Sequence, residues 1–150
     1  MAFLRTRNRS LIFAAAAALV LPAALLAAPE RLHAGQWEFT TSHVDGEPDS
    51  VKFCVSAEEA ASINGGTKTA RAYAEKQVKA GCRINEYTVS GNLVTSSVSC
   101  GKSTVRTRFT YGGDTSEGDR VIQREGQPEI VIHVKARRLG PCPPGEAGKP

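Results

Sequence analysis

The sequence lacks several patterns that would point to a particular chemistry. No two cysteines stand as C-x-x-C, which excludes zinc ribbons and thioredoxin-type redox sites. No serine stands in a G-x-S-x-G segment, the usual context of a hydrolase nucleophile. Asp and Glu are absent before Glu30, although three arginines lie there. Without those three arginines, 16 basic residues face 15 acidic ones, and this net charge of +1 argues against a nucleic-acid binder.

Residues 1–27 have the layout of a secretory signal peptide. Arg5, Arg7 and Arg9 precede an apolar run from Leu11 to Ala28 that is rich in Ala and Leu. A basic start followed by such a run directs export, and the run is short for a membrane span, which needs about 20 apolar residues. We expect cleavage after Ala27, with an uncleaved anchor as the alternative. No Arg-Arg pair precedes the run and no Cys follows it closely, so the signal is predicted to be of the Sec type.

Removing 27 residues from 150 leaves 123, which is enough for one small domain. We expect an N-terminal segment at 28–34, a single β-rich domain at 35–142 and a disordered, proline-rich tail at 143–150. With this export signal, the mature domain is predicted to lie in the periplasm of a bacterial envelope.

Apolar and polar residues alternate with a period of two through most of the domain. In the clearest case, Val105, Thr107 and Phe109 alternate with Arg106 and Arg108, which is typical of a strand with one buried face. Turn residues separate such segments. We predict seven strands, at 35–43, 49–55, 83–90, 93–100, 104–111, 118–124 and 129–138. They indicate an all-β fold, an antiparallel meander curled into a partly closed barrel, with an open curved sheet as the alternative.

A short helical insert interrupts the strands. Ser56 and Glu59 form a capping box that begins a first helix, and Asn64-Gly65-Gly66 ends it. A second helix is expected from about Lys68 to Ala80, closed by Gly81.

The four cysteines all lie beyond residue 27, and an even number in a small exported chain predicts two disulfides. A two-residue turn at Gly91-Asn92 sets Val89 opposite Val94. In that register Cys100 lies on the apolar face of the hairpin and Cys82 on the other face, so these two cannot bridge across it. The predicted disulfides are therefore Cys54–Cys82 and Cys100–Cys142.

The order of these features resembles a bacterial exported family known as domain of unknown function 3617. The resemblance covers Gly35 to Cys142 and rests on order and spacing rather than on one specific motif. The matching features are Gly35-x-Trp37-Glu38, Cys54 before a Glu-Glu-Ala helix start, Cys82, a Gly-Asn hairpin, Cys100, Tyr111-Gly112-x-Asp114 with Gly118, and Arg137-Arg138-x-Gly140-x-Cys142. The resemblance implies export and a small β-rich fold. It implies no activity and no functional residue.

Three further patterns are better explained without a functional site. Gly101-Lys102-Ser103-Thr104 is similar to the end of a phosphate-binding loop, but a strand follows where that loop requires a helix. The three histidines are predicted to be isolated surface residues: His33, His43 and His133. One group of acids lacks the spacing of a calcium loop and suits solvated turns: Asp114, Glu117 and Asp119. No catalytic residue, metal or cofactor is predicted, and we do not expect an enzyme.

The sequence favours non-enzymatic binding of a small apolar ligand inside the domain. The ligand would lie among inward-facing aromatic side chains, for which a packed core is the plainer interpretation: Trp37, Phe53, Tyr87, Phe109 and Tyr111. The alternative is a surface module for an anionic envelope component or a protein partner. Six cations on the last three strands are expected to share one outward face, with neighbouring acids able to neutralise much of it: Arg106, Arg108, Arg120, Arg124, Lys135 and Arg137.

Overall fold

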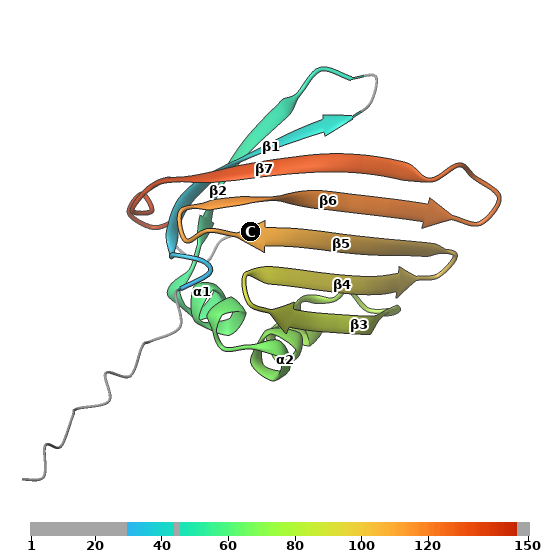
Figure 1. The fold of residues 1–150 in the computed structure, drawn as a ribbon, viewed down its shortest axis with the longest axis horizontal. Helices are drawn as coiled ribbons and strands as arrows, with labels where there is room; N and C mark the ends of the chain where they lie inside the picture. The colour runs from blue at the N-terminus through green and yellow to red at the C-terminus, as the bar shows by residue number, and fades with distance from the viewer. Residues whose placement is uncertain (1–29, 44–45, 147–150) are drawn as a thin grey trace, which may run out of the picture.

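The computed structural model describes residues 30–43 and 46–146 (Figure 1). The predicted signal peptide at 1–27 and the last four residues of the predicted tail lie outside the described residues. Seven strands form one antiparallel sheet: β1 (Gly35–His43), β2 (Asp49–Val55), β3 (Cys82–Ser90), β4 (Leu93–Cys100), β5 (Ser103–Tyr111), β6 (Thr115–Arg124) and β7 (Ile130–Gly140). These bounds agree closely with the alternation in the sequence, except that β6 begins three residues earlier than predicted.

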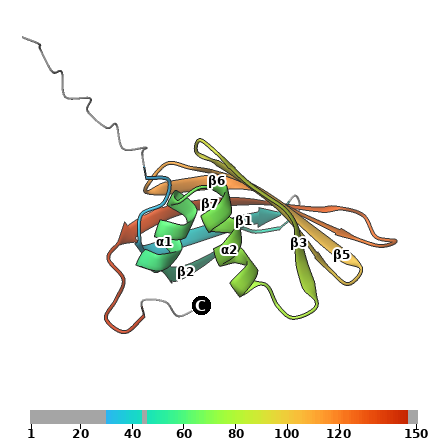
Figure 2. The ribbon, with the colours of Figure 1, turned by 90° about the horizontal axis from the view of Figure 1, so that it is seen from below.

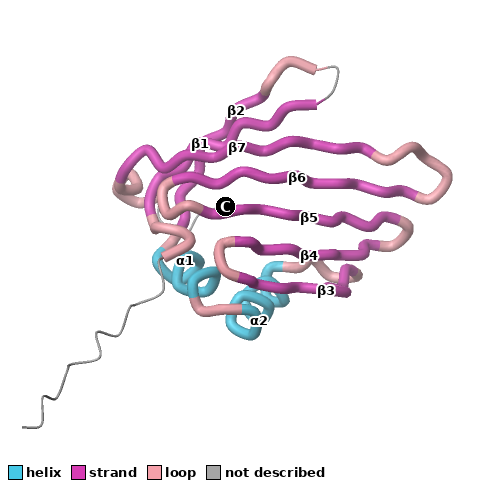
Figure 3. The backbone as a smooth tube through the Cα atoms, in the orientation of Figure 1, coloured by secondary structure: helices cyan, strands magenta, loops and turns pink. Residues whose placement is uncertain are grey.

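The strand order across the sheet is β2-β1-β7-β6-β5-β4-β3 (Figure 3). Strands β3 to β7 form a continuous meander, and the β1–β2 hairpin extends it beyond β7. The mostly β fold, its antiparallel pairing and the helical insert are therefore confirmed. The predicted barrel is wrong, because β2 and β3 remain as unpaired edges and the sheet is neither closed nor strongly curled. The chain between these two edges forms helices instead of pairing them.

Two helices make up this connection. Helix α1 (Ala57–Asn64) begins as predicted, since the Ser56 hydroxyl accepts a hydrogen bond from the Glu59 N–H at 3.1 Å. Helix α2 (Thr67–Gln77) ends before the predicted Ala80. Its last residue is followed by Val78, whose extended backbone, with ψ at 130°, cannot continue a helix.

The core lies between α1 and the end of the sheet where β1 begins. Trp37 is fully buried, and its indole N–H donates to the His33 carbonyl at 3.0 Å. Leu32 and Ala136 pack around it from the sheet side and Ala60 from α1. The N-terminal segment is part of this core, because Leu32 forms a parallel bridge with Gly113.

The strand register divides the side chains between two faces. Residues directly opposite each other in neighbouring strands share a face, so Phe53 opposite Trp37 and Ala136 opposite Phe39 all point towards the core. We call this side the inner face and the other side the outer face. Both helices lie at one end of the sheet, and the end with the β4–β5 and β6–β7 turns extends beyond them (Figures 1 and 2).

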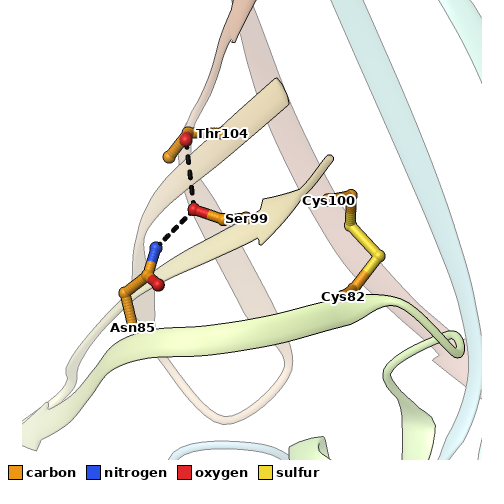
Figure 4. Close-up of a disulfide and its surroundings, with 5 residues drawn as sticks. All are labelled: Cys82, Asn85, Ser99, Cys100 and Thr104. Carbon is orange, nitrogen blue, oxygen red and sulfur yellow. Dashed lines mark hydrogen bonds between the residues drawn. A yellow bond between two sulfur atoms is a disulfide. The ribbon is translucent and has the colours of Figure 1, made fainter. Parts of the chain in front are cut away.

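A β-bulge at Asn85 overturns the predicted disulfides. Val89 lies opposite Val94 as expected, but the register shifts between Ile84 and Glu86. Cys82 consequently lies opposite Cys100, with a Cα–Cα distance of 4.2 Å, and a disulfide joins them (Figure 4). The predicted pairs Cys54–Cys82 and Cys100–Cys142 are wrong, because the argument from alternating faces assumed a ladder without a bulge. The extra residue is itself anchored, since Asn85 Nδ2 donates to Ser99 Oγ at 2.7 Å.

Candidate binding sites

The five aromatic residues proposed to surround a ligand are divided between the core and the sheet. Trp37 is inaccessible, and Phe53 and Tyr111 pack against the same core cluster. Burial raises the pKa of Tyr111 to about 12, as expected for a phenol held away from water. Phe109 lies on β5 with Tyr111, with the two ring centroids 6.5 Å apart, and Tyr87 lies on β3; neither belongs to the core cluster. Of the five, only Phe53 lines the large groove described next.

A groove of about 1100 Å³ runs along the edge strand β2 and is lined by residues of both helices. Its apolar surface comes from Val51, Phe53 and Tyr73. Phe53 is held in place by stacking on Phe39, with ring centroids 4.1 Å apart. Val51 is 55% exposed, which is unusual for a strand residue on the inner face. Charged side chains surround this apolar floor, among them Lys52, Lys76 and Glu146.

Two titratable groups of the groove are shifted by burial. Burial raises the pKa of Glu59, and the hydrogen bond from the Ser56 backbone opposes part of that shift. Burial also raises the pKa of the Tyr73 phenol, and the nearby carboxylates of Glu59 and Glu58 add to it. The side chains of Glu59 and Tyr73 are thus partly withdrawn from water, while Glu58 beside them is exposed.

The six cations predicted to share a face lie on two. Arg108 lies directly opposite Asp119 in the register of β5 and β6, so both side chains lie on the outer face. Arg106 lies on the same face. Arg120, the next residue along β6, pairs with Thr107 and lies on the inner face. Arg124 lies on the inner face as well, opposite Ser103. The prediction was wrong because one strand's alternation does not say which of its faces matches that of its neighbour.

Acids neutralise part of the outer face. Arg106 forms an ion pair with Glu129 at 2.7 Å, and Arg137 forms one with Glu38 at 2.7 Å. Among the described residues, Arg108 and Lys135 have no ion pair within 4.0 Å. They line a shallow hollow of about 350 Å³.

A row of aliphatic side chains crosses the inner face near the β4–β5 and β6–β7 turns, and at its β3 end Arg71 of α2 donates to the Ile84 carbonyl at 3.3 Å. The register places one β-branched residue of each of five consecutive strands directly opposite the next. None of them belongs to the buried core, and Ile130 is 40% exposed. We call this set the aliphatic row: Ile130, Ile122, Val105, Val98 and Ile84. Arg120 and Arg124 lie two residues on either side of Ile122, so cations flank the row. The sequence alone does not reveal this row, because the alignment of its side chains across the strands depends on the register and on the bulge.

Two histidines are not isolated as predicted. His33 Nδ1 lies 2.8 Å from Asp114 Oδ1, and His133 Nδ1 lies 2.5 Å from Asp119 Oδ1. Asp114 and Asp119 are thus partners of histidines rather than free turn residues. Within residues 30–43 and 46–146, no three His, Cys, Asp or Glu side chains gather as a metal site would require.

The length of the helices and a comparison with known proteins complete the description. Neither helix in the described ranges is long and apolar enough to cross a membrane. No curated protein and no solved structure matches the chain. A family model does match residues 32–142, which is most of the sequence, and its description is Protein of unknown function (DUF3617). The chain therefore belongs to the DUF3617 family.

Proposed function

We propose that this protein binds a small apolar ligand in the groove between β2 and the two helices. The observation that carries the proposal is the side chain of Val51, which is 55% exposed in this groove of about 1100 Å³. A ligand covering Val51 and the Phe53 ring would remove apolar surface from water, which stabilises a complex by about 25 cal/mol for each Å² buried. The charged side chains around the groove would suit a ligand with one polar end, which would stay in contact with solvent.

Binding without catalysis is the function that this groove supports best. Its titratable groups are acids and lysines at the rim, the Tyr73 phenol and the Cys54 thiol. Burial raises the pKa of Cys54 to about 11, and a thiol that stays protonated is a poor nucleophile. None of His33, His43 and His133 lines the groove, so no imidazole lies beside that thiol to accept its proton. The periplasm remains the proposed location, and the Cys82–Cys100 disulfide is consistent with it.

Titration with the neutral dye N-phenyl-1-naphthylamine tests the groove. The dye's fluorescence should rise on binding to the native protein, and Val51→Lys should weaken the binding at least tenfold. The matched control is Leu139→Lys, because Leu139 is also an exposed aliphatic side chain, at 39%, but lies outside the groove. Equal loss in both variants, or no saturable binding by the native protein, would reject the groove as the site.

A second candidate function is binding to an anionic surface of the envelope. The aliphatic row supports it, because the row spans four interstrand spacings, roughly 19 Å, and carries Arg120 and Arg124 beside it. Aliphatic side chains flanked by cations suit the interface of an anionic lipid bilayer, where each cation adds about 1 kcal/mol. Among the described residues neither arginine forms an ion pair within 4.0 Å, whereas Arg106 and Arg137 of the outer face are both paired with acids.

Co-sedimentation with phosphatidylglycerol vesicles tests the second candidate. Arg120→Glu with Arg124→Glu should abolish binding if the inner face meets the lipid. The control is Arg108→Glu with Lys135→Glu, which makes the same change of charge on the outer face. Loss of binding only in the control would assign the lipid to the outer face, and binding by neither native nor variant protein would reject both surfaces.

A further inference from the structure

Cys54 and Cys142 are the two cysteines outside the Cys82–Cys100 disulfide. Cys54 lies on the outer face of β2 opposite Gln36, and Gln36 in turn lies opposite Gly140 at the end of β7. The strands that carry Cys54 and Gly140 are therefore two interstrand spacings apart, about 10 Å. Cys142 follows Gly140 by only two residues, which is enough chain to cross that distance.

The segment after β7 does cross back over β2. Cys54 is only 5% exposed, although it lies on the outer face of an edge strand. Cys142 lies close enough to the Cys54 thiol to raise its pKa, and the carboxylate of Glu146 adds to that shift. A turn closed by the Glu146 N–H and the Pro143 carbonyl, at 3.2 Å, shapes the segment. The two cysteines outside the Cys82–Cys100 disulfide therefore lie close to each other.

We propose that Cys54 and Cys142 form a second disulfide, which fastens the segment after β7 to the edge strand β2. Two neighbouring thiols within a domain that already holds one disulfide are the arrangement that an oxidising compartment converts into a bond. The bridge would close a long loop and also cover the outer side of an edge strand, where unpaired backbone groups invite association with other chains.

The bond forms by exchange with an oxidised dithiol carrier. Cys142 is half-buried and Cys54 buried, so the carrier reaches Cys142 first. The Cys142 thiolate attacks one carrier sulfur, which gives a mixed disulfide and releases the other carrier sulfur as a thiolate. Cys54 then loses its proton and attacks the Cys142 sulfur, and the carrier leaves as a dithiol. Two protein thiols are oxidised and one carrier disulfide is reduced, with both protons ending on the carrier. Burial raises the pKa of Cys54 to about 11, which makes the second step slow without making it unfavourable.

The bridge also bears on the groove, and this part of the inference rests on the proposed function. Cys54 and Glu146 both line the groove, so a disulfide at Cys142 would hold the segment with Glu146 as a fixed wall. Reduction of the disulfide would release the segment that carries Glu146. Dye affinity in the groove should therefore fall in Cys142→Ser, while the disulfide map described next does not depend on any ligand.

Peptide mapping after controlled oxidation tests the bridge directly. Trypsin separates all four cysteines, because cleavage sites follow Lys52, Lys68, Lys79, Arg83, Lys102 and Arg138. The full chain is reduced, oxidised with glutathione under native conditions, alkylated and digested. We expect one linked peptide containing Cys54 and Cys142 beside the one containing Cys82 and Cys100. Alkylated Cys54 and Cys142 in a sample whose Cys82–Cys100 link has re-formed would overturn the proposal, since that link shows that oxidation took place.

Single substitutions separate this bridge from other pairings. In Cys142→Ser, we expect one alkylated thiol, at Cys54, and an unchanged Cys82–Cys100 link. The oxidised native protein should also need a higher denaturant concentration for half-unfolding than this variant. A link from Cys54 to any other cysteine in the native protein would contradict the assignment. Loss of dye binding with an intact Cys54–Cys142 link would count against the groove alone.

Discussion

Asn64 and Leu32 exchange hydrogen bonds in both directions. The Leu32 N–H donates to Asn64 Oδ1 at 3.0 Å, and Asn64 Nδ2 donates to the Leu32 carbonyl at 2.9 Å. The Arg31 N–H donates to the same Oδ1 at 2.7 Å, and the Arg31 guanidinium donates to the carbonyl oxygens of Ile63 and Asn64. The last residue of α1 therefore holds the segment before β1 in place, and that segment supplies Leu32 to the core.

Replacing Asn64 should destabilise the fold far more than its position at a helix end suggests. Asn64→Ala leaves the N–H and carbonyl groups of Leu32 without their partner, which we expect to lower the free energy of unfolding by about 1–3 kcal/mol. Asn64→Asp keeps the acceptor but loses the donor, so its free energy of unfolding should lie between those of the native protein and Asn64→Ala. Urea denaturation measures the change, with Asn92→Ala, at an exposed turn, as the control expected to stay within about 0.5 kcal/mol. A similar loss in both variants would show that the exchange adds little.

Trp37 should be the most sensitive single position of the core. Trp37→Ala removes the fully buried indole and leaves a cavity, which typically costs about 3–5 kcal/mol. Thermal unfolding followed by circular dichroism should show a large drop in Tm. Phe109→Ala is the comparison, because Phe109 is only half-buried and lies outside the core cluster, so a smaller drop is expected. Equal drops would mean that the core extends across the sheet as far as β5.

The Cys82–Cys100 disulfide closes a loop of 18 residues and should contribute about 3 kcal/mol to stability. Cys82→Ser with Cys100→Ser removes it without changing side-chain size greatly. We expect a lower urea midpoint and a slightly steeper slope, because the unfolded chain without the bridge is less compact and exposes more surface. The hairpin turn at Gly91 lies at the other end of β3 and β4, so the strands should still pair. A variant as stable as the native protein would show that the disulfide adds no stability to the strand pairing already present.

The sequence was sufficient for the strands and insufficient for their alignment. Alternation in each segment located β4 and β5 almost to the residue, and the capping box located the start of α1. Neither the alternation nor the capping box predicts the bulge at Asn85, because any polar residue that finds a hydrogen-bond partner can occupy a bulge. One unpaired residue reversed the faces of everything before it in β3, and the predicted disulfides failed with it.

The candidate sites depended on the same missing information. The arginines of β5 and β6 were found by composition, but only register separates Arg108 from Arg120. The aliphatic row is likewise invisible until Val98 and Val105 are aligned. Closure failed for a different reason, since alternation does not say which strands become edges. The pairing of β1 with β7, a contact between chain ends, decided that the sheet stays open.

Glu59 should make stability depend on pH in a direction opposite to that of most carboxylates. Its pKa in the folded protein is raised above the ordinary value of 4.5, chiefly because burial disfavours the charged form. The folded state therefore binds this proton more tightly than the unfolded chain does. The resulting stabilisation is fully present below about pH 4.5 and is lost as the pH rises through the folded-state pKa.

Glu59→Gln isolates this effect, because glutamine is uncharged but still able to accept the hydrogen bond of the capping box from Ser56. At pH 7 the variant should unfold at a higher urea concentration than the native protein, and the difference should shrink towards pH 4. Glu58→Gln is the matched control, since Glu58 is an exposed carboxylate in the same first turn and faces the same helix dipole. If both variants respond equally, the dipole rather than burial governs Glu59. A native protein that gains stability on passing upward through this pH range relative to Glu59→Gln would reverse the predicted sign.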